Sequence, residues 1–179
     1  MLSFSRRVRA AALLAAVIVP AVVLSLTGCA PAVPMTPAPD ATNPACADVI
    51  VRLRTVTALG DNLKRETNAQ ATAAWGNPAA VLLRCGVAVP GPSALLCVTL
   101  KGIDWLRDDS NAPNYVFTTY GRDPAVQVVI DGTRASGTDA LMDLSNAVGS
   151  IPATRACTNP DDVLGLPSPS PTPTPAPTP

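Results

Sequence analysis

The chain has 179 residues, no histidine, and 13 basic against 13 acidic residues. The lack of histidine excludes Ser/His/Asp and Cys/His nucleophile arrangements and removes the commonest metal ligand. Three of the basic residues are arginines of the first ten positions, which belong to a predicted signal. The remainder is therefore net acidic, which argues against nucleic acid as a partner.

Residues 1–28 are predicted to be a lipoprotein signal peptide. The three arginines precede an apolar run over residues 10–26, which is the order of regions in a secretory signal. The run ends in the lipobox Leu26-Thr27-Gly28-Cys29. It is shorter than the ~20 apolar residues of a transmembrane helix. A diacylglyceryl group carrying palmitate on Cys29 would supply the two chains that stable anchoring needs. We therefore expect attachment to the plasma membrane at its extracytoplasmic face.

Two proline-rich segments are predicted to bracket one globular domain at residues 45–160. The first is a Pro/Ala/Thr-rich tether at residues 29–44, which has no apolar periodicity. The second is a tail at residues 161–179, in which every second residue from Pro167 onward is proline. Such a tail favours an extended, disordered chain. The alternative is a wall-spanning spacer or a glycosylated stalk.

The first element of the domain is predicted to be a helix. Asn43 followed by Pro44 is a good helix start, because asparagine caps and proline suits the first turn. Apolar residues then recur at helical spacing up to Gly60, a natural stop. Residues 61–75 are predicted to be a polar loop.

Four β-rich segments follow, and a second helix comes after them. The strands are predicted at residues 80–87, 95–106, 115–120 and 125–130. Ser136 with Asp139 resembles a capping box that opens a helix ending at Gly149. The expected fold class is α+β: a small two-layer domain, in which an antiparallel meander of about four strands is flanked by an N-terminal and a C-terminal helix.

The five cysteines predict two disulfides besides the lipidated Cys29. An even number of remaining cysteines in an exported chain favours disulfides, with three possible connectivities. We favour Cys85–Cys97, which would join two consecutive strands, and Cys46–Cys157, which would tie the first helix to the segment after the last one. No CxxC spacing is present, so no zinc site is expected.

Four short blocks in the same order resemble a known family. They lie at residues 74–78, 83–87, 102–106 and 117–122. Together they resemble an actinobacterial family of exported proteins known only as a domain of unknown function, the 3515 family. The resemblance covers roughly residues 45–152. It implies an envelope location and a small cysteine-containing domain, with no established activity.

The candidate binding surface is a sheet face that carries charged and aromatic side chains. Asp104 alternates with apolar neighbours on its strand and could pair with Arg84 or Arg122 from a neighbouring strand. We expect the surface to consist of Arg84, Asp104, Tyr120 and Arg122, with Trp75 at its rim. A structural ion pair and a core position for the tryptophans are the competing interpretations. Neither a metal nor a cofactor is expected.

These features favour a non-catalytic binding or accessory module at the cell envelope. Its expected partners are the plasma membrane, through the lipid, and an envelope protein or cell-wall component. One alternative is a carboxylate-dependent, glycan-processing enzyme using Asp104 with Asp108 or Asp109, which requires two carboxyl groups ~5–9 Å apart. The other is a structural spacer that associates with the wall through its proline-rich tail.

Overall fold

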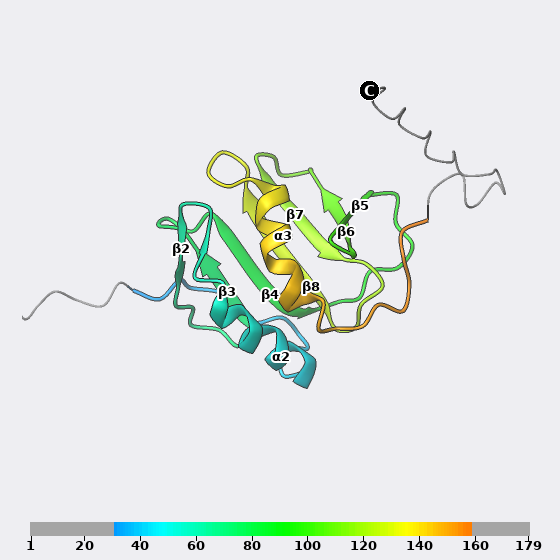
Figure 1. Cartoon of the computed structure of the whole chain (residues 1–179), viewed down its shortest axis with the longest axis horizontal. Helices are drawn as coiled ribbons and strands as arrows, with labels where there is room; N and C mark the ends of the chain where they lie inside the picture. Colours follow the sequence, from blue (N-terminus) through cyan, green and yellow to red (C-terminus); the bar gives the residue numbers. More distant parts are fainter. Residues whose placement is uncertain (1–30, 159–179) are drawn as a thin grey trace, which may run out of the picture. The chain divides into compact units, whose positions relative to one another are not determined.

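The strands form one antiparallel sheet in the order β1-β2-β3-β4-β8-β7-β6-β5 (Figure 1). The computed structural model describes residues 31–158. In chain order the strands are β1 (Ala58–Leu59), β2 (Asn62–Arg65), β3 (Thr72–Trp75), β4 (Val81–Val87), β5 (Leu96–Leu100), β6 (Ile103–Asp108), β7 (Asn114–Thr119) and β8 (Ala125–Asp131). The prediction of a four-stranded meander is therefore wrong: the sheet has eight strands, and β4 pairs with β8 rather than with β5.

Both predicted helix starts are confirmed. Helix α2 (Pro44–Arg52) begins after Asn43, whose side chain accepts a hydrogen bond from the Ala45 amide. Helix α3 (Gly137–Val148) begins after Ser136, whose hydroxyl accepts from the Asp139 amide. The first helix ends earlier than predicted, in the 3₁₀ turn η2 (Leu53–Thr55). The apolar residues that extended the helical pattern toward Gly60 instead lead into β1.

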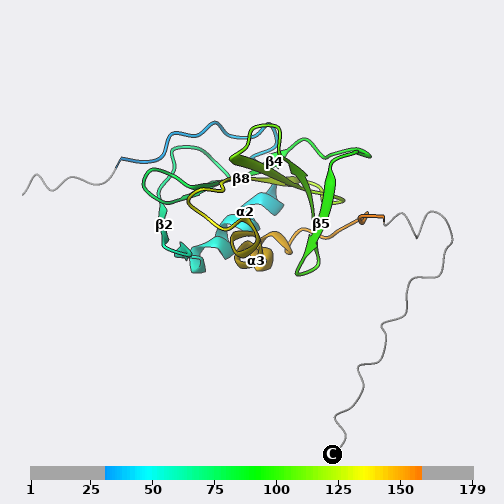
Figure 2. The ribbon, with the colours of Figure 1, turned by 90° about the horizontal axis from the view of Figure 1, so that it is seen from above.

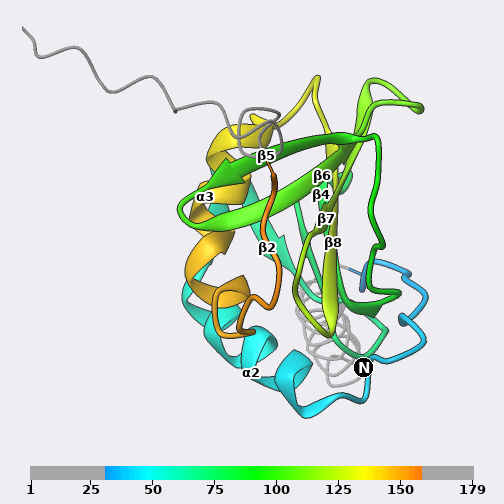
Figure 3. The same ribbon diagram turned by 90° about the vertical axis from the view of Figure 1, so that its right-hand side faces the viewer.

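The two helices cover one face of the sheet and enclose the core (Figure 3). Alternate residues of the central strands point to this face, as the two-residue period of a strand requires. On β4 and β8 these residues are buried, whereas those between them are half-exposed. Trp75 and Trp105 are the largest fully buried side chains.

The opposite face of the sheet is crossed by the N-terminal segment at residues 32–43 (Figure 2). Its backbone is bonded at both ends: Val33 donates to the Glu66 carbonyl over 2.8 Å, and Asp40 donates to the Gly86 carbonyl over 3.0 Å. Gly86 has a φ of +94°, and a Cβ there would fall on the Asp40 backbone. The ordered domain therefore begins well before residue 45, within the segment predicted to be a tether.

Residues 61–75 contain two strands and not the predicted polar loop. The first, β2, pairs with β1 and β3 close to the sheet edge and carries polar side chains. The second, β3, consists mainly of small residues and is completely buried. Neither has the β-branched alternation on which strand prediction depends, so local sequence gave no signal for either.

The predicted strand at residues 95–106 is a hairpin of β5 and β6. The chain reverses at Lys101 and Gly102, which both have positive φ, of 47° and 74°. Two consecutive residues in this conformation match the right-handed twist of the flanking strands. The single predicted strand is thus divided by a two-residue turn.

The chain has two disulfides in its described part, and both favoured pairings were wrong. Cys46 is joined to Cys85 and Cys97 to Cys157. Because β4 lies beside β8 and β5 lies at the far edge, Cys85 and Cys97 are too far apart in the sheet to form a hairpin staple. Instead, each disulfide ties a strand to a segment packed against it: Cys85 to α2, and Cys97 to the C-terminal segment.

Among residues 31–158, no helix is long and apolar enough to cross a membrane. The predicted signal peptide, Cys29 and the proline-rich tail lie outside the described residues.

The two disulfides are expected to differ in their rate of reduction. Cys46 and Cys85 are fully buried, whereas Cys97 and Cys157 are half-exposed, and thiol attack requires access to sulfur. Limited reduction of the folded protein, followed by alkylation and peptide mass mapping, should label Cys97 and Cys157 first. Equal labelling of all four cysteines at partial reduction would contradict this order.

Candidate functional site

The predicted binding surface is not a single surface in the structure. Trp75 lies on the helix face, is fully buried, and donates its indole N–H to the Val56 carbonyl over 3.2 Å. It cannot form an exposed rim, and its core interpretation is confirmed. Arg84 lies on the opposite face, where its Nε donates to Gln127 Oε1 over 2.8 Å. Residues 34–36 line the same shallow hollow as Arg84.

The structure brings Asp104, Tyr120 and Arg122 together around the C-terminal segment. Asp104 accepts hydrogen bonds from the Thr99 hydroxyl over 2.6 Å and from the Cys157 amide over 2.8 Å. The guanidinium of Arg155 lies over the Tyr120 ring, 5.5 Å from its centroid. These polar groups already bind the chain's own residues, so their contacts are structural.

Arg122 is the buried cation of this group. Its guanidinium donates to the carbonyls of Ile151 and Gly102, and only 6% of the residue is exposed. Burial lowers the pKa of Arg122, and the negative charge of Asp104 opposes that shift. Arg122 thus holds the end of the domain to the β5–β6 turn.

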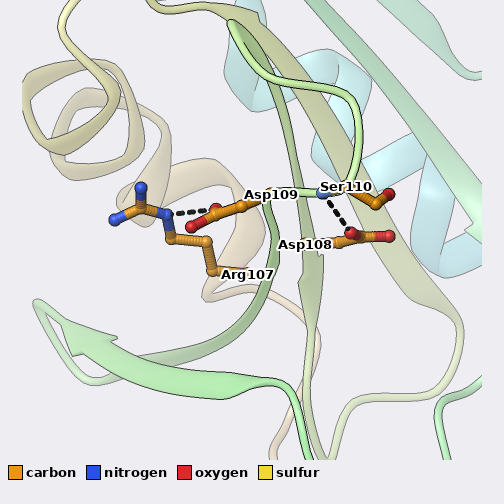
Figure 4. A network of polar contacts seen from close by, with 4 residues as sticks. All are labelled: Arg107, Asp108, Asp109 and Ser110. Carbon is orange, nitrogen blue, oxygen red and sulfur yellow. Dashed lines mark hydrogen bonds and ion pairs between the residues drawn. The ribbon is translucent and has the colours of Figure 1, made fainter.

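The carboxylates proposed for glycan cleavage point away from one another (Figure 4). Asp109 forms an ion pair with Arg107 over 2.6 Å, while Asp108 accepts from the Ser110 amide over 2.8 Å. That backbone hydrogen bond is the main cause that lowers the pKa of Asp108. The Asp104 carboxylate already has two partners. The geometry therefore does not direct Asp104, Asp108 and Asp109 toward a common cleft.

A cavity that the sequence did not predict lies between the N-terminal end of α3 and strands β5–β7. Its volume is about 340 Å³. It forms because the β5–β6 hairpin bends toward α3 (Figure 3), so the edge of the sheet and the start of the helix become its two walls. The apolar part of the lining is formed by Val98, Leu100, Phe117 and Leu141.

The polar part of this cavity's lining centres on Arg107. The residue projects to the helix face, and its Cζ atom lies 4.9 Å from the centroid of the Tyr115 ring. Its Nε donates to Asp109 Oδ1 over 2.6 Å. Ring and carboxylate together fix the guanidinium at the cavity wall. Within residues 31–158, no group of three or more histidine, cysteine, aspartate or glutamate residues could hold a metal ion.

One signal in the sequence could have identified Arg107. Ile103, Trp105 and Arg107 are spaced two apart and share one face of β6, where the first two are buried. A charged residue on the apolar face of a strand indicates either a pair or a polar site at the edge of the core. The predicted binding surface lies on the opposite face of β6, which carries Asp104.

Fold and site together define a small disulfide-linked antiparallel-sheet domain with a cavity between helix and sheet. Residues 8–156 match the family described as protein of unknown function (DUF3515), and the chain belongs to that family. The family membership that the four sequence blocks suggested is thereby confirmed. No curated protein matches the chain, and no solved structure matches it either.

Replacing Arg122 should destabilise the fold. The substitution Arg122→Met keeps a long apolar stem but leaves the carbonyls of Gly102 and Ile151 without their donor. We expect a loss of about 2–3 kcal/mol in the free energy of unfolding, measured by urea denaturation. The matched control Arg54→Met removes an exposed cation and should change stability by less than about 0.5 kcal/mol. Equal stability of the two variants would contradict a structural role for Arg122.

Proposed function

We propose that the protein is a lipid-anchored module on the extracytoplasmic face of the plasma membrane, where it binds a ligand without transforming it. The observation that carries the binding role is the cavity between α3 and β5–β7. Its volume of about 340 Å³ falls within the range of ~300–1,000 Å³ typical of small-molecule sites. It also combines an apolar lining with a few polar groups, as such sites do.

The cavity has walls that are held in place by the core. Phe117 and Leu141 are 6% and 1% exposed, and each belongs to the main apolar cluster. Val98 and Leu100 pack against the same cluster from β5. A site whose lining is already packed needs little rearrangement to receive a ligand, which lowers the entropy cost of binding.

The anchor rests on the sequence. The lipobox places the modified residue at Cys29, and a disulfide-containing domain suits an oxidising, extracytoplasmic compartment. Two disulfides tie α2 and the C-terminal segment to the sheet. The disulfides support export of the chain, and lipidation of Cys29 is proposed from the lipobox.

The anchor is tested by intact mass spectrometry of the protein extracted from its native membrane. We expect a mature chain beginning at Cys29 with a diacylglyceryl adduct. Reduction should add four hydrogens, because two disulfides open. An unlipidated mass with a start upstream of Cys29 would contradict the anchor and leave a membrane-spanning or plainly secreted protein.

The cavity is tested with octanol, an uncharged probe with an apolar body. The protein is the mature chain, residues 29–179, with Cys29→Ser so that no lipid is added. Titration followed by NMR should shift the signals of Val98, Leu100, Phe117 and Leu141. The variant Gly137→Leu should weaken binding about tenfold or more, because a Cβ at Gly137 would point toward the Phe117 ring at 3.6 Å and the longer side chain would fill the space.

The control for this test is Gly91→Leu. Gly91 has open space around the position of a Cβ and does not line the cavity, so octanol should bind this variant as it binds the parent. Thermal unfolding checks that both variants are folded. A titration that leaves the four lining residues unshifted, or equal affinities for the two variants, would remove the support for a ligand-binding cavity.

A further inference from the structure

The cavity between α3 and β5–β7 contains one cation, Arg107, on an otherwise apolar face of its strand. The side chain is 35% exposed, and its neighbours on the same face of β6, Ile103 and Trp105, are buried. A guanidinium in such a position keeps its stem along apolar surface and its head at the edge. The contacts that Arg107 already makes therefore show which parts of its guanidinium remain available to a ligand.

Two of the surfaces of the Arg107 guanidinium are occupied. The planar face lies over Tyr115, with 4.9 Å between Cζ and the ring centroid. The Nε edge donates to Asp109 over 2.6 Å. Neither Nη atom has a hydrogen bond to another residue in the described part of the chain. A fixed guanidinium whose two Nη groups still carry their N–H donors is suited to a planar, bidentate acceptor.

We infer that the cavity binds a small monocarboxylate with an apolar body, its carboxylate on the two Nη atoms of Arg107 and its body against Val98, Leu100 and Phe117. This inference rests on the proposed binding function and specifies the chemical class of the ligand. The apolar lining would contact the hydrocarbon body of the ligand, and the guanidinium would bind its carboxylate.

The charge of the site distinguishes a monoanion from a dianion. Asp109 already neutralises Arg107, and its carboxylate remains close to any anion bound there. A phosphate monoester carries up to two negative charges at neutral pH, which doubles both its attraction to Arg107 and its repulsion by Asp109 and makes it more costly to remove from water than a carboxylate. The site is therefore expected to bind a monoanion more tightly than a dianion.

The experiment compares four probes of equal chain length on the mature chain with Cys29→Ser: octanoate, octanol, octylamine and octyl phosphate. Affinities are measured by calorimetry at neutral pH, with NMR to locate binding. Octanoate should bind about tenfold more tightly than octanol, as one charge-assisted pair provides. Octylamine and octyl phosphate should both bind more weakly than octanoate.

The variant Arg107→Gln should reduce octanoate affinity to that of octanol and leave octanol binding unchanged. The exposed pair with Asp109 contributes little to stability, so the variant should fold. Arg54→Gln is the matched control, since it removes a cation from an exposed position outside the cavity. This variant should still bind octanoate more tightly than octanol, by the same factor as the parent protein.

The variant Asp109→Asn should raise octanoate affinity, because it removes the competing negative charge and keeps an oxygen that can accept from Nε. A gain of affinity cannot result from misfolding. Equal affinities for octanoate and octanol, tighter binding of octyl phosphate, or an unchanged preference in Arg107→Gln would overturn the inference while the cavity function stands. If neither octanol nor octanoate shifts the lining residues, both the inference and the cavity function fall.

Discussion

Strands β4 and β8 lie side by side at the centre of the sheet, although β5, β6 and β7 intervene in the sequence. All other strand pairs join consecutive segments of the chain. The β4–β8 pair therefore unites two locally folded groups of strands, β1–β4 and β5–β8, into one sheet. Its buried residues supply the surface on which both helices pack. The cavity depends on the same pairing. Because α3 follows β8 in the chain, the pairing of β4 with β8 positions α3 opposite the β5–β6 hairpin at the sheet edge.

The disulfides reinforce this arrangement from opposite sides of the sheet. Cys85 is on the buried helix face and is joined to α2. Cys97 pairs in register with Leu106, which lies on the other face, and is joined to the C-terminal segment. Each half of the sheet thus has one covalent link to a segment that is not part of it. Loops of this length are expected to stabilise the fold by about 4 kcal/mol each in the chain-entropy model.

Sequence patterns predicted the features that depend on neighbouring residues. The capping side chains of Asn43 and Ser136 and the existence of the β-rich segments are local properties, and they are confirmed. The pairing of β4 with β8 and the two disulfides depend on residues far apart in the chain, so no local pattern could indicate them. The prediction of β2 and β3 failed because a short polar strand near the sheet edge and a strand of small residues both lack apolar alternation.

The same distinction between local and long-range features applies to the candidate site. Residue type drew attention to Asp104 and Arg122, and both side chains bind backbone groups of residues distant in sequence. A polar side chain with a partner on the chain's own backbone cannot be told from a binding residue by sequence alone. Arg107 could have been recognised from the face of β6 on which it lies. The cavity beside it could not have been predicted, because its other wall is formed by α3, which is distant in sequence.

The packing of residues 32–43 on the sheet limits how far the domain could extend from a lipid on Cys29, if that residue is modified as proposed. Val33 is already bonded to Glu66, and it lies only four positions after Cys29. Even fully extended, such a stretch spans at most ~14 Å. A lipid on Cys29 would therefore hold the domain within a thin layer next to the headgroups, with little freedom to move away. The ligands within its reach would be those that partition into, or leave, that layer.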